Sequence, residues 1–247
     1  MATATRGALI VIEGLDRSGK STQVTRLAQR LSSSSNSADG TAAASSSARV
    51  VKFPERTTTI GQMINGYLTN KTEVDDRAIH LLFSANRWEL VPSILKDLEA
   101  GTHVICDRYA FSGIAYSCAK GLPFQWCLEP DAGLPLPDAT LFLSLTPEAA
   151  AQRGAYGEER YEVPALQAKV RSVFGDVGKL LNRSPPPVST DAHTPAGSQS
   201  TWTEIDAGRT VDEVEAELWS HVQAAIQRVR HSRLPVGKLF SEGQGSK

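Results

Sequence analysis

Residues 7–22 read GALIVIEGLDRSGKST, and this stretch decides the fold. Its first part, residues 8–12, is a short apolar run rich in β-branched side chains, which is typical of a buried strand. Residues 14–21 then fit G-x-x-x-x-G-K-[ST], the phosphate-binding P-loop. Val24, Leu27 and Leu31 follow at helical spacing, so the motif lies between a strand and a helix, as a P-loop requires. The alternative, a glycine-containing turn without a ligand, is disfavoured by this context.

The residue types in the motif suit a nucleoside triphosphate. Gly14 and Gly19 let the backbone curl so that several N–H groups face an anion. Lys20 supplies positive charge for the β- and γ-phosphates, and Ser21 supplies a hydroxyl for Mg²⁺, the expected cofactor. The helix that follows directs its positive N-terminal end to the same place. The residues predicted to bind ATP are Gly14, Asp16, Arg17, Ser18, Gly19, Lys20, Ser21 and Thr22.

The composition is that of an ordinary globular chain. Its 247 residues are 40% hydrophobic and carry a net charge of −1, whereas general nucleic-acid and membrane binders use a basic surface. The cysteines, Cys106, Cys118 and Cys127, form no C-x-x-C pair, which favours reduced thiols over a disulfide framework or a zinc site. No apolar run approaches the ~18 residues of a membrane span. Residues 1–7 are too short and polar for a signal peptide, so we expect a cytoplasmic protein, with the nucleus open as a second location.

The rest of the chain alternates between strand and helix patterns. Further apolar runs at 50–53, 103–106, 140–145 and 202–205 read as strands. Five strand–helix alternations predict an α/β fold with a parallel sheet covered on both faces. We predict one domain over residues 1–230 and a polar tail over 231–247. Within the domain, the Ser-rich segment 32–48 and the Pro/Ser-rich segment 184–200 are predicted to be disordered inserts, and 152–162 to be a lid.

A long helical pattern over residues 75–100 carries Phe83 and Arg87 on one face, because they are four residues apart. An aromatic ring beside a guanidinium suits a nucleobase, since one can stack and the other can form hydrogen bonds. The alternative is a core phenylalanine and a solvated arginine. Pro92 removes one backbone hydrogen bond and should bend or interrupt this helix. Other helices are predicted at 60–68, at 111–120 and after the capping box of Thr210 and Glu213.

Charged residues follow two of the predicted strands. Arg56 comes shortly after the second strand, and Asp107 and Arg108 directly follow the third. Open α/β sheets bind ligands at the carboxyl ends of their strands. A P-loop enzyme reaches its Mg²⁺ with an aspartate at the end of an apolar strand, so Ser21 and Asp107 are the predicted metal ligands. The alternatives are a surface ion pair at Arg56 and a turn carboxylate at Asp107 that pairs with its neighbour.

Taken together, these residues resemble one family closely: the thymidylate kinases of the nucleoside monophosphate kinase group. The resemblance covers residues 7–206 and rests on IEGLDRSGKST, FPER, LLFSANRWE, DRYAFSG, PDAGLPLPD and RGAYGEERYE, with a weaker echo, LPVGKLF, near the C-terminus. It implies a P-loop NTPase fold with a five-stranded parallel sheet in the order 2-3-1-4-5, flanked by helices and with a lid. It also implies a homodimer whose partners are ATP and dTMP, with no nucleic acid and no membrane. The implied reaction transfers the γ-phosphoryl group of ATP to dTMP, giving dTDP and ADP in dTTP synthesis.

The resemblance also implies roles for single residues. Asp16 is similar to the carboxylate that meets the 3′-hydroxyl of dTMP, and Arg56 to a ligand of the acceptor phosphate. Phe83 resembles the ring that stacks on thymine, Arg87 the group that hydrogen-bonds its edge, and Tyr116 the ring that disfavours a ribose. The residues implied for dTMP binding are Asp16, Phe53, Arg56, Phe83, Arg87, Arg108, Ser112, Gly113 and Tyr116.

The candidate catalytic arginines implied by the resemblance lie in two places. Some members of the family use an arginine in the P-loop for the transferring phosphoryl group, and others use basic residues on the lid. This chain has Arg17 in the P-loop, which resembles the first kind, and Arg153 and Arg160 in the predicted lid, for which a plain charged loop is the alternative. The predicted catalytic set is Lys20, Arg17, Asp107, Arg153 and Arg160.

Two other functions remain open on the sequence. A P-loop GTPase switch would need D-x-x-G and N-K-x-D downstream, but no downstream aspartate has a glycine three residues later. Residues 70–73, NKTE, are only a near match, because they carry glutamate in place of aspartate. A catalytically inactive nucleotide-binding scaffold is disfavoured by the presence of Lys20, Arg17 and Asp107.

Overall fold

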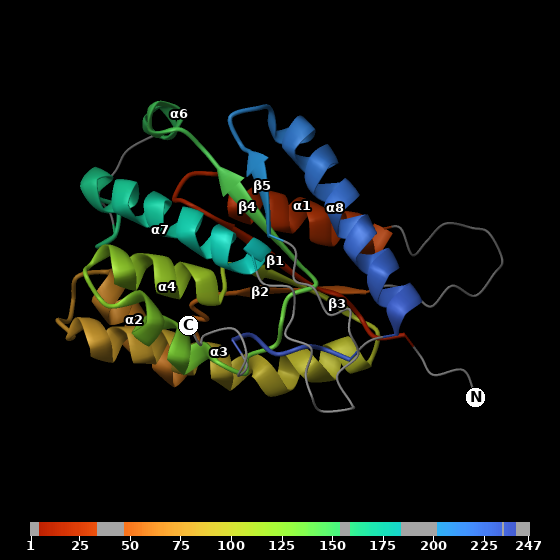
Figure 1. Cartoon of the computed structure of the whole chain (residues 1–247), viewed down its shortest axis with the longest axis horizontal. Coiled ribbons are helices and arrows are strands. Elements are labelled where there is room, and N and C mark those ends of the chain that lie inside the picture. The colour runs from red at the N-terminus through yellow and green to blue at the C-terminus, as the bar shows by residue number, and fades with distance from the viewer. Residues whose placement is uncertain (1–4, 34–46, 154–158, 184–201, 234, 241–247) are drawn as a thin grey trace.

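A parallel sheet forms the centre of the molecule (Figure 1). The computed structural model describes residues 5–33, 47–153, 159–183, 202–233 and 235–240, and within them the sheet has five strands. Their order is β2-β3-β1-β4-β5, which confirms the order implied by the resemblance, and every neighbouring pair is parallel. The strands are β1 (Leu9–Gly14), β2 (Ala48–Lys52), β3 (His103–Asp107), β4 (Ala139–Ser144) and β5 (Trp202–Asp206).

Helices cover both faces of the sheet (Figure 1). On one face α1 (Lys20–Ser33) and α8 (Val211–Ser232) pack around buried side chains such as Leu27 and Leu218. On the other face lie α3 (Asp76–Glu99), α4 (Ala110–Ala119) and α7 (Pro164–Arg183), whose core includes Phe111 and Phe174. The remaining described helices are α2 (Thr59–Leu68), α5 (Phe124–Leu128), the 3₁₀ turn η2 (Glu129–Asp131) and α6 (Pro147–Gln152).

The central strand β1 explains why the P-loop lies where it does. Leu9 and Val11 point into the core beneath α3 and α4, while Ile10 and Ile12 point into the core beneath α1 and α8. Alternate side chains of a strand face opposite sides, so a strand covered on both faces needs a continuous apolar run. β1 pairs with β3 in a register that sets Ile12 opposite Asp107. The P-loop and Asp107 therefore leave the same edge of the sheet side by side.

The helix α3 passes through Pro92 without interruption, so of the predicted bend or interruption the interruption is wrong. Proline removes only one N–H donor from the helix. The helix is held on both sides of Pro92 by buried apolar side chains, among them Leu90 and Ile94. Its start is capped by Asp75, whose carboxylate accepts a hydrogen bond from the Arg77 N–H at 2.9 Å.

The boundaries of the predicted inserts and lid need correction. Ser32 and Ser33 belong to α1, where their hydroxyls donate to backbone carbonyls one turn earlier, and Ala48 is the first residue of β2. Residues 34–46 of the first insert and the whole of the second, 184–200, lie outside the described residues, whereas Ser47 is described and its carbonyl accepts from His103 N. Of the predicted lid, residues 154–158 also lie outside them.

The predicted polar tail is wrong for its first half. α8 begins at the predicted capping box of Thr210 and Glu213 and continues to Ser232, past the predicted boundary at residue 231. The chain then returns to the core, where Leu239 is fully buried and its N–H donates to Leu134 O at 2.7 Å. The spacing of apolar residues did not predict this contact, because the single apolar pair Leu239 and Phe240 is too short to form a helix or strand pattern.

Candidate active site

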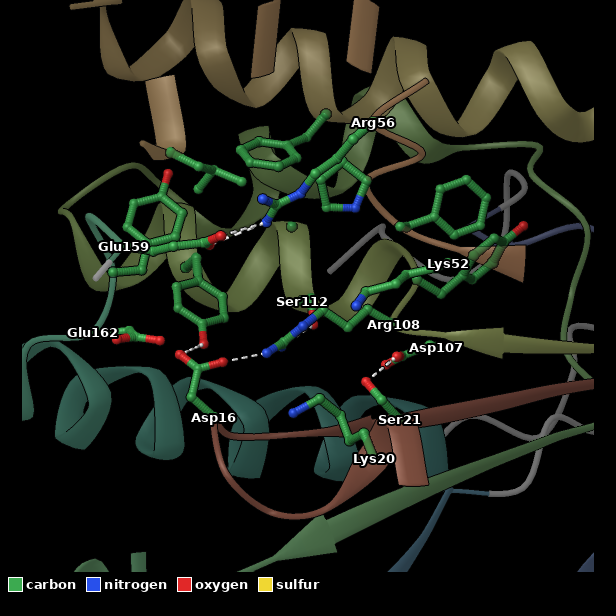
Figure 2. Close-up of a pocket in the computed structure, with 18 of the residues that line it drawn as sticks. Asp16, Lys20, Ser21, Lys52, Arg56, Asp107, Arg108, Ser112, Glu159 and Glu162 are labelled. Carbon is green, nitrogen blue, oxygen red and sulfur yellow. Dashed lines mark hydrogen bonds and ion pairs between the residues drawn. The ribbon is translucent and has the colours of Figure 1, made fainter. Parts of the chain in front are cut away.

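A cavity of about 420 Å³ opens at the carboxyl ends of the strands (Figure 2). Its walls come from the P-loop, the ends of β2 and β3, the helices α3 and α4, and the residues Glu159, Tyr161 and Glu162. Every residue predicted for dTMP binding lines it: Asp16, Phe53, Arg56, Phe83, Arg87, Arg108, Ser112, Gly113 and Tyr116. Of the predicted ATP-binding residues, those that line it are Asp16, Arg17, Gly19, Lys20, Ser21 and Thr22. Gly14 and Ser18 do not line the cavity and shape the loop behind it.

The P-loop holds Lys20 at the floor of the cavity. Gly14 and Gly19 have φ values of 151° and 87°, which only glycine adopts at low cost, and Arg17 has a φ of 67°. The Lys20 ammonium donates to Leu15 O at 2.5 Å, so it is folded back over the loop. Burial, with a further contribution from the Arg108 charge, lowers the pKa of Lys20 to about 7. An anion bound in the loop would restore the charged form.

Ser21 and Asp107 meet at the predicted metal position. The Ser21 hydroxyl donates to Asp107 Oδ2 at 2.6 Å, although the two residues come from α1 and β3 (Figure 2). A hydroxyl and a carboxylate oxygen that converge beside a phosphate-binding loop fit Mg²⁺, which keeps several waters and takes substrate phosphates as ligands. Within the described residues there is no cluster of three or more His, Cys, Asp or Glu side chains that could hold a metal alone.

Asp16 is the centre of a hydrogen-bond network between the P-loop and α4. Its Oδ1 accepts from the Arg108 guanidinium (Figure 2). Its Oδ2 accepts from Tyr116 OH at 3.0 Å and from Gln167 Nε2 at 2.7 Å. Burial alone would raise the pKa of Asp16, but the Arg108 and Lys20 charges outweigh it, so the pKa lies below its ordinary value. Asp16 is therefore a carboxylate that faces the middle of the cavity.

Glu13 is a buried carboxylate behind the site that the sequence analysis missed. Its carboxylate accepts hydrogen bonds from Tyr109 N at 2.9 Å, Ser112 N at 3.0 Å and Ser112 Oγ at 2.6 Å. Burial raises its pKa above the ordinary value, against the opposing effects of Ser112 and Arg108. Glu13 thus caps the start of α4 from the neighbouring strand β1. The sequence feature that could have revealed Glu13 is its charge, which directly follows the apolar run and precedes the P-loop.

Arg56 connects the cavity with the C-terminal part of the predicted lid. Its guanidinium donates to Asn65 Oδ1 at 2.9 Å and forms an ion pair with Glu159 at 2.8 Å (Figure 2). Glu159 and Glu162 both line the cavity, and neither was singled out from the sequence. Lys52, also missed, extends from the end of β2 into the same cavity and stands opposite Asp107 in the register of β2 and β3 (Figure 2).

Phe83 and Arg87, both on α3, line the cavity together. Their spacing of four residues predicts that they share one face of the helix. Arg87 is neither solvated nor free to rotate, because Nε and NH2 donate to the two oxygens of Asp131 at 3.0 and 2.6 Å. Its side chain is 2% exposed and that of Asp131 is 0% exposed. The guanidinium lies against Gly113, where an added Cβ would approach Arg87 NH2 to 2.9 Å. Gly113 therefore leaves room for the arginine.

The two lid arginines lie outside the cavity in this structure. Arg153 donates to Arg17 O at 3.3 Å and to Ala207 O at 2.5 Å, so it binds the back of the P-loop. Arg160 forms an ion pair with Glu73 at 2.6 Å and packs over the Tyr67 ring at 4.2 Å. Arg17, by contrast, lines the cavity, as do Lys20 and Asp107.

Comparison with known proteins agrees with this geometry. The family model described as thymidylate kinase matches residues 12–181. The chain belongs to the thymidylate kinase family. It is 41% identical over 236 residues to the thymidylate kinase of Danio rerio, a match that covers 95% of this chain and 98% of the relative. It is 40% identical over 238 residues to the thymidylate kinase of Homo sapiens, covering 96% and 99%.

A solved thymidylate kinase shares the fold. The structure of thymidylate kinase from Candida albicans superposes with a TM-score of 0.73 at 39% identity, covering 92% of this chain and 95% of that one. The chain is accordingly an enzyme that phosphorylates dTMP with ATP, a step in dTTP synthesis, which confirms the prediction. The alternatives of a GTPase switch and an inactive scaffold are not supported. Among the described residues, none of the helices combines the length and the apolar character that crossing a membrane requires.

Proposed function

We propose that this thymidylate kinase binds both substrates in the one cavity, with the ATP phosphates on the P-loop and dTMP between Asp16 and α3. The observation that carries the proposal is the continuity of the cavity, which runs from Lys20 to Phe83 and Arg87 without a dividing wall. A phosphoryl transfer needs its donor and acceptor in line, and a shared cavity holds them that way.

On the donor side, Lys20 and the N–H groups of the loop hold the β- and γ-phosphates. Ser21 and Asp107 together hold Mg²⁺, which neutralises phosphate charge when it is bound. Their present hydrogen bond of 2.6 Å keeps both oxygens directed at that position. In this proposal Arg17, which lines the cavity, stabilises the charge that spreads over the oxygens of the transferring group.

On the acceptor side, the thymine ring stacks on Phe83 and receives hydrogen bonds from Arg87, which Asp131 holds in place. Arg56 and Arg108 bind the acceptor phosphate, and Phe53, Ser112 and Gly113 complete the wall. Asp16 accepts from the 3′-hydroxyl of the sugar, and Tyr116 occupies the space beside the 2′ position. The acceptor phosphate is already an anion, so the reaction needs no general base, and the chain supplies positioning and charge.

The proposal is tested by measuring ADP formation with dTMP, dUMP, dCMP, dGMP and UMP, with and without Mg²⁺. We expect dTMP to give the highest kcat/KM and chelation of Mg²⁺ to abolish turnover. The test is informative because the related Candida albicans enzyme is described as having a broad substrate specificity. Phe83→Ala should raise KM for dTMP and leave KM for ATP nearly unchanged. If both KM values rise equally, Phe83 does not bind the base.

We also propose a homodimer that buries the outer face of α2 and α3. Leu81 and Trp88 are seven residues apart and therefore on one face of α3, and their exposed fractions are 48% and 40%. Met63 on the neighbouring α2 is 55% exposed. Leu81→Asp should convert the dimer to a monomer in light scattering, whereas Val211→Asp, at an equally exposed valine on α8, should not. A monomeric wild-type chain would contradict the dimer.

That the protein binds no nucleic acid and resides in the cytoplasm, or also in the nucleus, remains as predicted from the sequence.

A further inference from the structure

Cys118 and Cys127 lie in contact, although nine positions separate them in the sequence. Cys118 is in the last turn of α4, and Cys127 is in α5. The two thiols are close enough that each shifts the pKa of the other. The turn between them is tight, because the N–H of Gly121 donates to Cys118 O at 2.9 Å and that of Cys127 donates to Pro123 O at 3.1 Å. The backbone therefore fixes both cysteines.

The buried side chain of His80 brings the same two segments together independently. Its Nδ1 is 2.7 Å from Ser117 Oγ, and its Nε2 is 3.1 Å from Cys127 O. A carbonyl oxygen only accepts, so Nε2 donates to Cys127 and Nδ1 accepts from the Ser117 hydroxyl. The residue before Cys118 and the backbone of Cys127 thus lie at opposite corners of one imidazole ring. This places the thiol pair at a defined junction of α3, α4 and α5.

The two thiols differ in the way that a reactive pair requires. Cys118 is partly exposed, whereas Cys127 is fully buried. The neighbouring Cys127 thiol lowers the pKa of Cys118, while the Cys118 thiol and burial raise the pKa of Cys127. A thiolate is the reactive form of cysteine, and redox-sensitive cysteines are accessible and stand beside a resolving thiol. Cys106, fully buried in β3 with a pKa raised by burial, has neither property.

We propose that Cys118 and Cys127 are an oxidation site that forms a reversible intramolecular disulfide with a peroxide. The Cys118 thiolate attacks one oxygen of hydrogen peroxide, the O–O bond breaks, and Cys118 becomes a sulfenic acid while the other oxygen leaves as hydroxide. The sulfur of Cys127 then attacks the sulfenic sulfur, so the S–S bond forms and the S–O bond breaks. The hydroxyl leaves as water with the proton of Cys127. In sum, two thiols and one peroxide give a disulfide and two water molecules.

The bond would join two segments that support the dTMP half of the cavity. Tyr116 and Ser117, just before Cys118, line the cavity, and Asp131, a few residues after Cys127, orients Arg87. Disulfide geometry is specific, so closing the bond constrains the positions of these two segments relative to each other. We therefore expect oxidation to raise KM for dTMP severalfold with little change in KM for ATP. This consequence rests on the proposed function, whereas formation of the bond does not.

The experiment treats the purified full-length chain with hydrogen peroxide, alkylates the remaining thiols under denaturing conditions, and maps the unreduced peptides by mass spectrometry. We expect the number of free thiols to fall from three to one, with a linked Cys118–Cys127 peptide pair that dithiothreitol separates. Cys106→Ala should retain the linked pair and serves as the matched control. Cys118→Ala should form no linked pair. Cys127→Ala should instead accumulate a sulfenic acid at Cys118 that dimedone traps.

Retention of three free thiols in the wild-type chain would overturn the proposal, as would a bond that involves Cys106. A disulfide between two chains, seen as a dimer on a non-reducing gel, would also overturn it. The kinetic consequence has its own readout. If the intramolecular bond forms and KM for dTMP is unchanged, the site is an oxidation site without influence on the cavity. That result would overturn the link to dTMP binding and leave the assignment of dTMP phosphorylation intact.

Discussion

The guanidinium of Arg108, at the end of β3, is paired with the carboxylate of Asp16, inside the P-loop. This ion pair joins the loop proposed to hold ATP to the helix start proposed to hold the dTMP phosphate. Asp16 also accepts from Tyr116 OH at 3.0 Å, so a shift of the P-loop would displace both Arg108 and Tyr116 on the acceptor side. The two halves of the cavity are therefore parts of one polar network.

The first prediction concerns the carboxylate of Asp16. If it accepts a hydrogen bond from the 3′-hydroxyl of dTMP, the wild-type enzyme should prefer dTMP over its 3′-deoxy analogue by about 1.5–3 kcal/mol in kcat/KM, the range for a charged hydrogen bond. Asp16→Asn should reduce that preference to about 0.5–1.5 kcal/mol, because the bond becomes neutral. Steady-state kinetics with both nucleotides give the two ratios. Equal ratios in wild type and variant would show that Asp16 does not meet the 3′-hydroxyl.

The second prediction concerns the buried ion pair of Arg87 and Asp131. Asp131→Asn leaves the Arg87 charge without compensation at 2% exposure, and breaking a buried pair in this way costs about 3–5 kcal/mol. Urea unfolding should show a loss of that size together with a higher KM for dTMP. The control is Asp212→Asn, which removes a partner of Arg26 whose side chain is 83% exposed and should cost at most about 1 kcal/mol. Equal losses in the two variants would refute the structural role of the buried pair.

The sequence predicted the parts of the site that depend on local spacing. The P-loop and the Phe83–Arg87 pair each follow from a pattern within a few residues, and the strand ends place Asp107 and Arg108. Asp131 could not be found this way, because its contact with Arg87 joins residues 44 positions apart in the chain. For the same reason the sequence analysis missed Gln167, whose amide donates to Asp16 from α7.

The third prediction concerns the C-terminal segment that was expected to be a tail. Leu239 is fully buried in the core beneath α4, so Leu239→Ala should lower the free energy of unfolding by about 2–5 kcal/mol. Val211→Ala, at a side chain that is 48% exposed, should change it by less than about 0.5 kcal/mol. Urea denaturation measures both. A loss below about 1 kcal/mol for Leu239→Ala would mean that this segment is not part of the core.

The fourth prediction concerns protons bound by Lys20. With a pKa of about 7 in the folded chain, Lys20 is mostly neutral at pH 8, and the phosphates of ATP should return its proton. Calorimetric titration with ATP at pH 8, in two buffers of different ionisation enthalpy, should therefore show uptake of close to one proton. Lys20→Met should show none, whereas Lys71→Met, at an exposed lysine outside the cavity, should behave as wild type. Uptake that persists in Lys20→Met would assign the proton to another group.

The same pKa determines how stability changes with pH. Because the folded pKa of Lys20 lies below the value of 10.5 for an unperturbed lysine, the unfolded chain binds more protons between pH 7 and 10.5. The contribution of Lys20 to the free energy of unfolding should therefore rise with pH across that window. Comparing urea unfolding of wild type and Lys20→Met at pH 7 and pH 9 isolates this contribution. If the free energy of unfolding of the wild type exceeds that of Lys20→Met by less at pH 9 than at pH 7, this pH dependence is contradicted.

The last prediction concerns the arginine that serves the transferring phosphoryl group. Arg17 lines the cavity, whereas Arg153 binds the backbone of Arg17 and Ala207, and Arg160 is paired with Glu73. Arg17→Gly removes the guanidinium at a φ of 67° that glycine adopts readily, so folding should be preserved. We expect kcat to fall at least ~100-fold, about 2.7 kcal/mol of barrier. KM for dTMP should change much less, because the interaction is made chiefly in the transition state.

Arg153→Ala and Arg160→Ala are the comparison that decides this assignment. Each removes a guanidinium that is held outside the cavity by its own contacts, so each should lower kcat by less than Arg17→Gly under saturating ATP and dTMP. Arg153→Ala should be the costlier of the two, because its side chain supports the backbone of Arg17 at 3.3 Å. If either variant loses more kcat than Arg17→Gly, the catalytic arginine comes from the lid. Its present contacts with Ala207 or Glu73 must then break before each turnover.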